Sequence, residues 1–304
     1  MADQRINNSD GRASALAYLA VLIFAWGGNY TWMKIALADI GPWAMNFARY
    51  ALGIGLIATA LIFAGRTREL IPVRGERIEL ACIGFLQAAV ITGATAVALQ
   101  WIEATRTVLI AYTVPIWTMI FSLLVLRERP TWAGVAGTLV GLAGLAVLTN
   151  PHAMQWNAAT IPGTFAALIG AIGWSLGSVL YRRRPWRSTF WQQVFWQLAT
   201  TTLATGVGWF VLERGHSIRP TATLGVLIVY MAAAPTVIGY WCWSQALSRL
   251  SASAASQVLL LSPVFGMLQS HFVLGEPLSP ALLAAALCIV AGAWITLAAR
   301  PRRA

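Results

Sequence analysis

Hydrogen-bonding and aromatic side chains recur at helical spacing inside otherwise apolar stretches of this sequence. Trp26 shares a helix face with Asn29 and with Tyr30, and Trp174 and Ser178 form a similar stripe further along. Aromatic faces combined with a few hydrogen-bonding groups suit an aromatic or amphipathic small molecule. The predicted substrate-binding residues are Trp26, Asn29, Tyr30, Gln87, Tyr112, Trp174, Ser178, Tyr240 and Gln257.

These side chains have two interpretations. An asparagine or glutamine that faced lipid would lack hydrogen-bond partners at a high cost, so each is expected to face another helix or a water-filled cavity. A hydrogen bond between helices would contribute about 0.6–2 kcal/mol. For a single residue we favour neither the contact between helices nor the cavity. For a set distributed over several helices we favour one shared cavity.

Lys34 and Arg49 are basic residues well inside apolar stretches. A charge at such a position costs about 2.5–3.5 kcal/mol on insertion scales. One interpretation is that both residues contact a carboxylate of the substrate. The other is structural, in which they bond carbonyl groups at helix ends or extend to the outer surface of the membrane.

Proline and glycine residues predict where helices bend and where they pack. Pro115 and Pro263 each remove a backbone hydrogen bond near the middle of an apolar stretch, so we interpret them as hinges that bend during a conformational change, with a static kink as the alternative. A stripe of glycines lies on one face of the apolar stretch 131–149 and consists of Gly134, Gly137, Gly141 and Gly144. Small residues allow helices to pack closely, so this stripe is expected to pack against the last apolar stretch or against a second copy of the chain.

The composition indicates a membrane protein. Of 304 residues, 58% are hydrophobic and only 10% are charged, whereas soluble domains carry about 25% charged residues. The net charge of +11 comes from arginines that lie between apolar runs, which favours loops beside anionic lipid over nucleic-acid binding. The three cysteines form no CxxC pair, and no GxxxxGK or HExxH motif occurs. We therefore expect no enzyme, no cofactor and no metal site.

The apolar runs predict the fold class, an all-α membrane protein. About 20 apolar residues span the hydrocarbon core as a helix. Ten stretches qualify, and they are separated by turn-forming or charged residues. The predicted spans are 14–38, 42–64, 77–101, 106–126, 131–149, 160–181, 188–212, 221–247, 251–274 and 280–299.

The arginines predict the orientation of the chain. Cytoplasmic loops of membrane proteins carry an excess of Lys and Arg. With the N-terminus in the cytoplasm, the loop and tail arginines all fall on the cytoplasmic side except Arg106, Arg214 and Arg219. Ten spans then place the C-terminus in the cytoplasm as well.

The sequence repeats itself at a fixed offset of 148 residues. This shift superposes Trp26 on Trp174, and it also superposes Pro115 on Pro263 and Glu128 on Glu276. The chain therefore divides into two halves of five spans. Because five is odd, the second half is inverted, which is typical of transporters with a central substrate site. The predicted boundaries are a cytoplasmic tail at 1–13, a first repeat at 14–149, an external linker at 150–159, a second repeat at 160–299 and a cytoplasmic tail at 300–304.

The acidic residues fall in tails, loops, turns or the first turn of a span. A proton relay in a pump usually needs a carboxylate near the middle of the membrane. We therefore expect transport without proton coupling through a buried carboxylate. For Glu128 and Glu276 we favour a structural role, in which each carboxylate caps the start of the following helix.

Two parts of the sequence resemble the EamA domain of the drug/metabolite transporter superfamily. They are the stretch FAWGGNYTWMKIALADIGPWAMNFARYALG and the paired stretches TVPIWTMIFSLLVLRERPTW and SPVFGMLQSHFVLGEPLSP. The resemblance implies two inverted five-helix repeats around a central cavity, and export of amino acids or other metabolites. It also implies basic residues at the positions of Lys34 and Arg49 in members with different substrates, which favours their structural interpretation.

We therefore predict a transporter of the bacterial inner membrane that exports aromatic amino acids or similar small amphipathic metabolites by alternating access. The direction of transport follows from the resemblance alone. One alternative is efflux of cationic drugs, which the lack of a mid-membrane carboxylate disfavours. Another is a membrane scaffold or receptor without transport. The expected partners are a small-molecule substrate and the lipid bilayer, with no nucleic acid, and the chain would be a monomer or a homodimer.

Overall fold

The computed structural model describes residues 3–98, 101–102, 107, 110–149, 160–215, 217–274 and 280–298. These residues form helices and connecting turns, and no strand occurs among them, as the apolar runs predict. Each of the ten predicted spans contains helix. Helix α1 begins at Asp3, so it extends into the predicted N-terminal tail.

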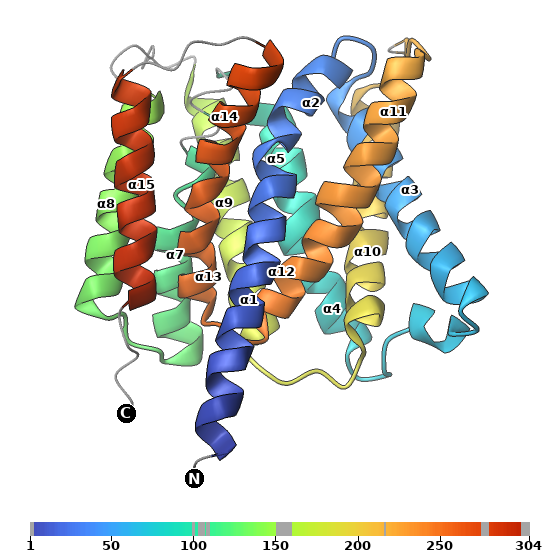
Figure 1. Cartoon of the computed structure of the whole chain (residues 1–304). Coiled ribbons are helices and arrows are strands. Elements are labelled where there is room, and N and C mark those ends of the chain that lie inside the picture. The colour runs from blue at the N-terminus through green and yellow to red at the C-terminus, as the bar shows by residue number, and fades with distance from the viewer. Residues whose placement is uncertain are drawn as a thin grey trace. The chain divides into compact units, whose positions relative to one another are not determined.

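Several predicted spans consist of more than one helical piece (Figure 1). In chain order the pieces are α1 (Asp3–Gly27), α2 (Asn29–Ala36), α3 (Pro42–Phe63), the short 3-10 helix η1 (Thr67–Leu70), α4 (Arg77–Gly84), the π-helix η2 (Phe85–Val90), α5 (Ile91–Ala98), α7 (Val114–Phe121), the π-helix η3 (Ser122–Leu126), α8 (Trp132–Thr149), α9 (Ile161–Arg182), α10 (Phe190–Leu212), α11 (Ala222–Met231), the π-helix η6 (Ala232–Ile238), α12 (Gly239–Leu247), α13 (Ala252–Val258), the 3-10 helix η7 (Leu259–Leu261), α14 (Ser262–Leu274) and α15 (Pro280–Ala298).

Within the described ranges, four helical stretches are long and apolar enough to cross a membrane: Pro42–Phe63, Arg77–Ala98, Ile161–Arg182 and Ala222–Leu247. Five shorter apolar helices lie in other predicted spans. Helix α10 has the required length, but it buries glutamine and threonine side chains such as Gln193, Gln197 and Thr201. Length and hydropathy together therefore identify fewer spans than the ten predicted from the sequence.

The helices pack into two compact units, and each unit draws on both halves of the sequence. Unit 1 comprises Met1–Phe85 and Arg184–Ser251, and unit 2 comprises Leu86–Arg183 and Ala252–Ala304. Helices that are close in the chain therefore do not always belong to the same unit.

Antiparallel helix pairs hold unit 1 together. Helix α10 packs along α3, where the rings of Phe47 and Trp209 stack with centroids 5.3 Å apart. Gly206 makes room for this contact, because a Cβ there would lie 3.0 Å from the Phe47 ring. Helix α1 runs along α12, as Figure 1 shows, and Tyr18 meets Trp241 edge-on at 5.3 Å.

The start of α3 is capped from a distant part of the chain. Gly41, the residue before the helix, has no side chain that could accept the first N–H groups. The carboxylate of Glu213 accepts hydrogen bonds from the backbone N–H groups of Trp43 at 2.8 Å and Ala44 at 2.9 Å, and Glu213 is only 6% exposed. A carboxylate also interacts favourably with the positive end of the helix dipole.

Close contacts between small residues hold unit 2 together. Helix α8 packs along α15, and the two lie side by side in Figure 1. A Cβ on Gly137 would lie 2.5 Å from the carbonyl oxygen of Gly292, and one on Gly144 would lie 2.7 Å from that of Ala285. The predicted glycine stripe therefore packs against the last helix of the same chain, the first of the two partners that the sequence allowed.

The π-helices η2 and η6 occupy equivalent positions in the two halves. The 148-residue shift places η2 on residues 233–238, which lie inside η6. In η6, Pro235 has no N–H to donate to the carbonyl of Met231, and the Thr236 hydroxyl donates to that carbonyl instead, at 2.7 Å. Wide helical turns of this kind are frequent at functional sites.

Pro115 and Pro263 have different settings. Pro115 is the second residue of α7, so its missing N–H lies in the first turn of a helix, where it would have had no intrahelical partner. Pro263 lies within a helical stretch that continues from α13 through the 3-10 helix η7 into α14. The hinge and static-kink interpretations of both prolines remain predictions.

Candidate functional site

Aromatic rings from three helices of unit 1 meet around Tyr240. We call Trp26, Tyr50, Tyr240 and Trp243 the aromatic cluster. The ring centroids of Trp26 and Tyr240 are 5.8 Å apart, those of Tyr50 and Tyr240 are 6.4 Å apart, and those of Trp26 and Trp243 are 6.2 Å apart. The two pairs that include Tyr240 meet edge-to-face, which is favourable for aromatic rings at these distances.

Hydrogen bonds fix the rings of the aromatic cluster. The indole N–H of Trp26 donates to the carbonyl of Pro235 at 2.8 Å. The indole also packs on Gly239, where a Cβ would lie 2.5 Å from the Trp26 ring nitrogen. The hydroxyl oxygens of Tyr50 and Tyr240 are 3.4 Å apart. The π-helix η6 and the glycine that follows it therefore position Trp26.

Arg49 lies beside the aromatic cluster. Its Nη2 donates to the Tyr50 hydroxyl at 2.8 Å, and its Cζ lies 4.6 Å from the centroid of the Tyr50 ring. The side chain is 9% exposed and bonds no helix-end carbonyl among the described residues. Among the described residues, the contacts of Arg49 are thus with Tyr50 and Met33, and its predicted roles remain predictions.

The neighbouring candidates on α2 are described only in part. The amide of Asn29 donates to the sulfur of Met33 at 3.1 Å, within the same helix. The side chains of Tyr30 and Lys34 lie outside the described residues, so their predicted roles remain predictions.

Two members of the aromatic cluster, Tyr50 and Trp243, are absent from the sequence prediction. Tyr50 is 1% exposed and so is Trp243. Trp243 follows Tyr240 by three residues on α12, a spacing that places both on one helix face. The same rule that selected Trp26 with Asn29 would have found Trp243. Tyr50 gives no such signal, because only the fold brings α3 to α12.

Gln87, Ser178 and Trp174 come together in unit 2. Gln87, in the π-helix η2, donates to the Ser178 hydroxyl at 2.8 Å, and Ser178 donates to the carbonyl of Trp174 at 2.7 Å. All three are buried. Helix α9 approaches η2 closely through Gly173, where a Cβ would lie 3.1 Å from the carbonyl of Leu86. Tyr112 lies half-buried in the turn before α7.

Gln257 links helices. From α13 its amide donates to the hydroxyl of Thr138 at 2.5 Å and to the carbonyl of Gly134 at 3.2 Å, both on α8. Ser256 beside it lies 3.2 Å from the hydroxyl of Thr118 on α7. These contacts match the interhelical alternative for Gln257.

The predicted substrate-binding residues thus divide between the two units. Trp26, Asn29 and Tyr240 belong to unit 1, together with Arg49. Gln87, Tyr112, Trp174, Ser178 and Gln257 belong to unit 2. Within unit 1 the structure brings Trp26 and Tyr240 into contact, and within unit 2 it joins Gln87 to Ser178.

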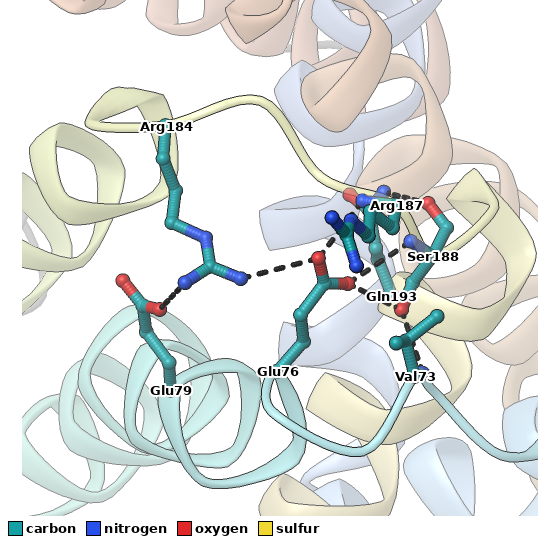
Figure 2. A network of polar contacts seen from close by, with 7 residues as sticks. All are labelled: Val73, Glu76, Glu79, Arg184, Arg187, Ser188 and Gln193. Atoms are coloured by element: carbon teal, nitrogen blue, oxygen red, sulfur yellow. Dashed lines mark hydrogen bonds and ion pairs between the residues drawn. The ribbon is translucent and has the colours of Figure 1, made fainter.

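A second polar site in unit 1 connects the loop before α4 to the segment before α10 (Figure 2). The carboxylate of Glu76 accepts hydrogen bonds from the N–H groups of Arg187 and Ser188, both at 2.9 Å, and from the Ser188 hydroxyl at 2.6 Å. Arg184 lies 3.1 Å from Glu76 and 3.2 Å from Glu79. We call this network the Glu76 clamp.

The Glu76 clamp is buried at its centre, where Glu76 is 2% exposed. Burial by itself raises the pKa of Glu76, but the hydrogen bonds from Ser188, from the Arg187 backbone and from Arg184 outweigh burial, so the pKa lies below its ordinary value of 4.5. The carboxylate therefore stays ionised at neutral pH and ties two loops to the start of α10.

The helix-capping role expected for Glu128 is wrong. The Thr131 hydroxyl caps α8 by accepting the N–H of Gly134 at 3.0 Å. Glu128 instead lies 3.8 Å from Arg182 as a partly exposed ion pair. Glu276 lies outside the described residues.

The bundled apolar helices and the small-residue packing define a multi-pass membrane protein with two similar halves. The chain belongs to the EamA-like transporter family, which matches residues 13–150 and again residues 161–298. It is therefore a transporter and not an enzyme.

Named relatives agree with this assignment along nearly the whole chain. An uncharacterized transporter of Bacillus subtilis, YcxC, is 24% identical over 292 residues, which is 91% of each chain. A probable amino-acid metabolite efflux pump of Salmonella typhimurium is 24% identical over 298 residues, which is 93% of each chain. A protein of known crystal structure shares the fold with a TM-score of 0.80 at 24% identity, over 93% of this chain and 96% of that chain.

Proposed function

We propose that this transporter exports aromatic amino acids or similar small amphipathic metabolites across the bacterial inner membrane by alternating access. We also propose that the chain crosses the membrane ten times as two inverted repeats, with both termini in the cytoplasm. The relative from Salmonella typhimurium carries the name of an amino-acid metabolite efflux pump, which supports the substrate class. The acidic side chains that the structure describes lie in loops or near helix ends, which supports transport without proton coupling through a buried carboxylate.

The aromatic cluster is the observation that carries the substrate preference. Trp26 and Tyr240 come from helices of different halves and meet at 5.8 Å beside a π-helix. An aromatic side chain of a substrate would gain the same edge-to-face contacts, each worth about 0.5–1.5 kcal/mol beyond the burial of its area. Aliphatic substrates would gain only the free energy that comes from burial of their apolar area.

Flux into liposomes tests the proposed function. Purified protein would be reconstituted without an ion gradient and offered radiolabelled phenylalanine, tryptophan, alanine or a lipophilic cation, with empty liposomes as the reference. Selective flux of phenylalanine and tryptophan supports the proposal. Flux of the cation alone, or flux that requires a proton gradient, contradicts the substrate class or the coupling respectively. Absence of any flux favours a scaffold or receptor.

Replacement of Trp26 by alanine is expected to reduce phenylalanine flux about tenfold and alanine flux much less. The change removes one ring of the aromatic cluster and with it roughly 1.4 kcal/mol of contact to an aromatic substrate. The measurement is the ratio of the two fluxes at equal protein density in the liposomes. Trp132→Ala is the matched control, because Trp132 is 87% exposed on α8. An unchanged ratio in Trp26→Ala would remove Trp26 from the site.

A further inference from the structure

Several buried polar atoms of unit 1 lack a hydrogen-bond partner among the described residues. Two of them belong to side chains that contact Met33, namely Nε of Arg49 and Oδ1 of Asn29. Both side chains converge on one atom, the sulfur of Met33, which lies 3.1 Å from Nδ2 of Asn29 and 4.0 Å from Nη1 of Arg49. A thioether sulfur can only accept a hydrogen bond, so the amide nitrogen of Asn29 faces it and the oxygen is left over.

The charge of Arg49 has no acidic partner among the described residues. A guanidinium group keeps its charge in proteins, and a buried charge is costly unless it is paired. The described carboxylates have other partners: Asp39 accepts from Thr221, Glu69 pairs with Arg66, Glu76 and Glu79 pair with Arg184, Glu128 pairs with Arg182, and Glu213 caps α3. The Tyr50 ring and hydroxyl therefore provide the main contacts to Arg49.

The second half of the chain shows that helix packing does not require a charge at this position. The 148-residue shift places Arg49 of α3 on Gln197 of α10. Gln197 is 1% exposed, and it packs against Gly84 of α4. A neutral side chain thus serves the packing in one half, where the amide nitrogen of Gln197 also lacks a hydrogen-bond partner among the described residues, while the other half carries a buried cation.

We propose that Arg49 and Asn29 bind the head group of a zwitterionic α-amino acid. The guanidinium group of Arg49 pairs with the carboxylate of the ligand, and Oδ1 of Asn29 accepts a hydrogen bond from its ammonium group. The free donor of the Arg49 cation can pair with an anionic group, and the free acceptor of Asn29 can bind a hydrogen-bond donor. The carboxylate and the ammonium group of an amino acid supply both. The inference rests on the proposed function. It adds that Arg49 and Asn29 bind the head group of the ligand, whereas the aromatic cluster binds its side chain.

Competition for radiolabelled phenylalanine on the purified protein tests the head-group site. The competitors are phenylalanine, phenylalaninamide, which lacks the carboxylate, and 3-phenylpropionate, which lacks the ammonium group. Wild-type protein is expected to bind each truncated ligand at least about tenfold more weakly, because each leaves one buried group unpaired. Equal binding of phenylalanine and phenylalaninamide to the wild type overturns the proposal without any variant.

Variants assign the two contacts separately. Arg49→Gln is expected to weaken binding of phenylalanine and 3-phenylpropionate about tenfold or more and to leave phenylalaninamide unchanged. Asn29→Leu is expected to weaken phenylalanine and phenylalaninamide and to leave 3-phenylpropionate unchanged. Arg249→Gln is the matched control, since Arg249 is an exposed arginine of the same unit that contacts Tyr18 and Gln245. A uniform loss for all three ligands in Arg49→Gln assigns Arg49 to folding and overturns its role.

Leucine as a fourth competitor separates this inference from the proposed function. If leucine binds as tightly as phenylalanine and shows the same dependence on Arg49, the head-group site stands and the aromatic preference fails. If phenylalanine is bound selectively but the acid and the amide respond equally to Arg49→Gln, the aromatic preference stands and the head-group site fails.

Discussion

Glu76→Gln is expected to lower the free energy of unfolding by about 3 kcal/mol at neutral pH. The glutamine keeps the size of the side chain but removes the charge that binds Arg184 and turns one acceptor oxygen into a donor that faces Ser188. Donors that are buried and then left unpaired are costly. The measurement is the unfolding transition of the detergent-solubilised protein in denaturant, followed by tryptophan fluorescence.

The effect of Glu76 should depend on pH in one direction. Because the pKa of Glu76 is lower in the folded protein than its ordinary value of 4.5, its stabilising contribution is complete above about pH 4.5. The contribution is lost as the pH falls through the folded-state pKa, so the wild type and Glu76→Gln should converge in acid. A difference that stays constant with pH would contradict the role of the ionised carboxylate.

Glu69→Gln is the matched control for Glu76→Gln, because it makes the same chemical change in the same loop. The Arg66 guanidinium holds the pKa of Glu69 below its ordinary value, but Arg66 is 51% exposed. Exposed ion pairs contribute roughly 0–1 kcal/mol. An equal loss of stability in the two variants would show that burial in the Glu76 clamp has no special importance.

Alanine at Gly137 or at Gly292 is expected to destabilise unit 2 by about 1–3 kcal/mol, the usual cost of overpacking. A Cβ on Gly137 would lie 2.5 Å from the carbonyl oxygen of Gly292, and one on Gly292 would lie 2.5 Å from that of Gly137. Backbone atoms cannot rotate away as side chains can, so α8 and α15 must separate. The measurement is the unfolding transition of each single variant and of the double variant.

The double variant and two control glycines make the packing prediction specific. Both substitutions act on one helix contact, so the double variant should lose less stability than the sum of the losses in the two single variants. Gly55→Ala in α3 and Gly225→Ala in α11 meet nothing within 4 Å. In a helix interior such changes should be neutral or slightly stabilising. Destabilisation by the controls of the same size would assign the effect to loss of glycine in general.

The local sequence determined where the helices lie. Apolar runs of span length, broken by proline, glycine and charge, placed helix in each of the ten predicted segments, because the backbone of an apolar stretch must satisfy its hydrogen bonds within itself. The 148-residue repeat was visible in side chains alone, and the π-helices η2 and η6 follow it. The glycine stripe in 131–149 likewise identified a packing face before its partner was known.

The tertiary structure decided which of these features meet. Gly41 gives no sign that Glu213, 170 residues from Trp43, caps α3. Tyr50 joins Tyr240 only because α3 and α12 pack in one unit, and Gln257 bonds to α8 although its residue type suited a cavity equally well. Helical periodicity fixes a face within one helix but says nothing about which other helix covers it. The sequence alone therefore determined the class of protein and its helices. The long-range contacts of the fold decided the members of the aromatic cluster and the partners of Gln257, because those contacts join residues that are far apart in the chain.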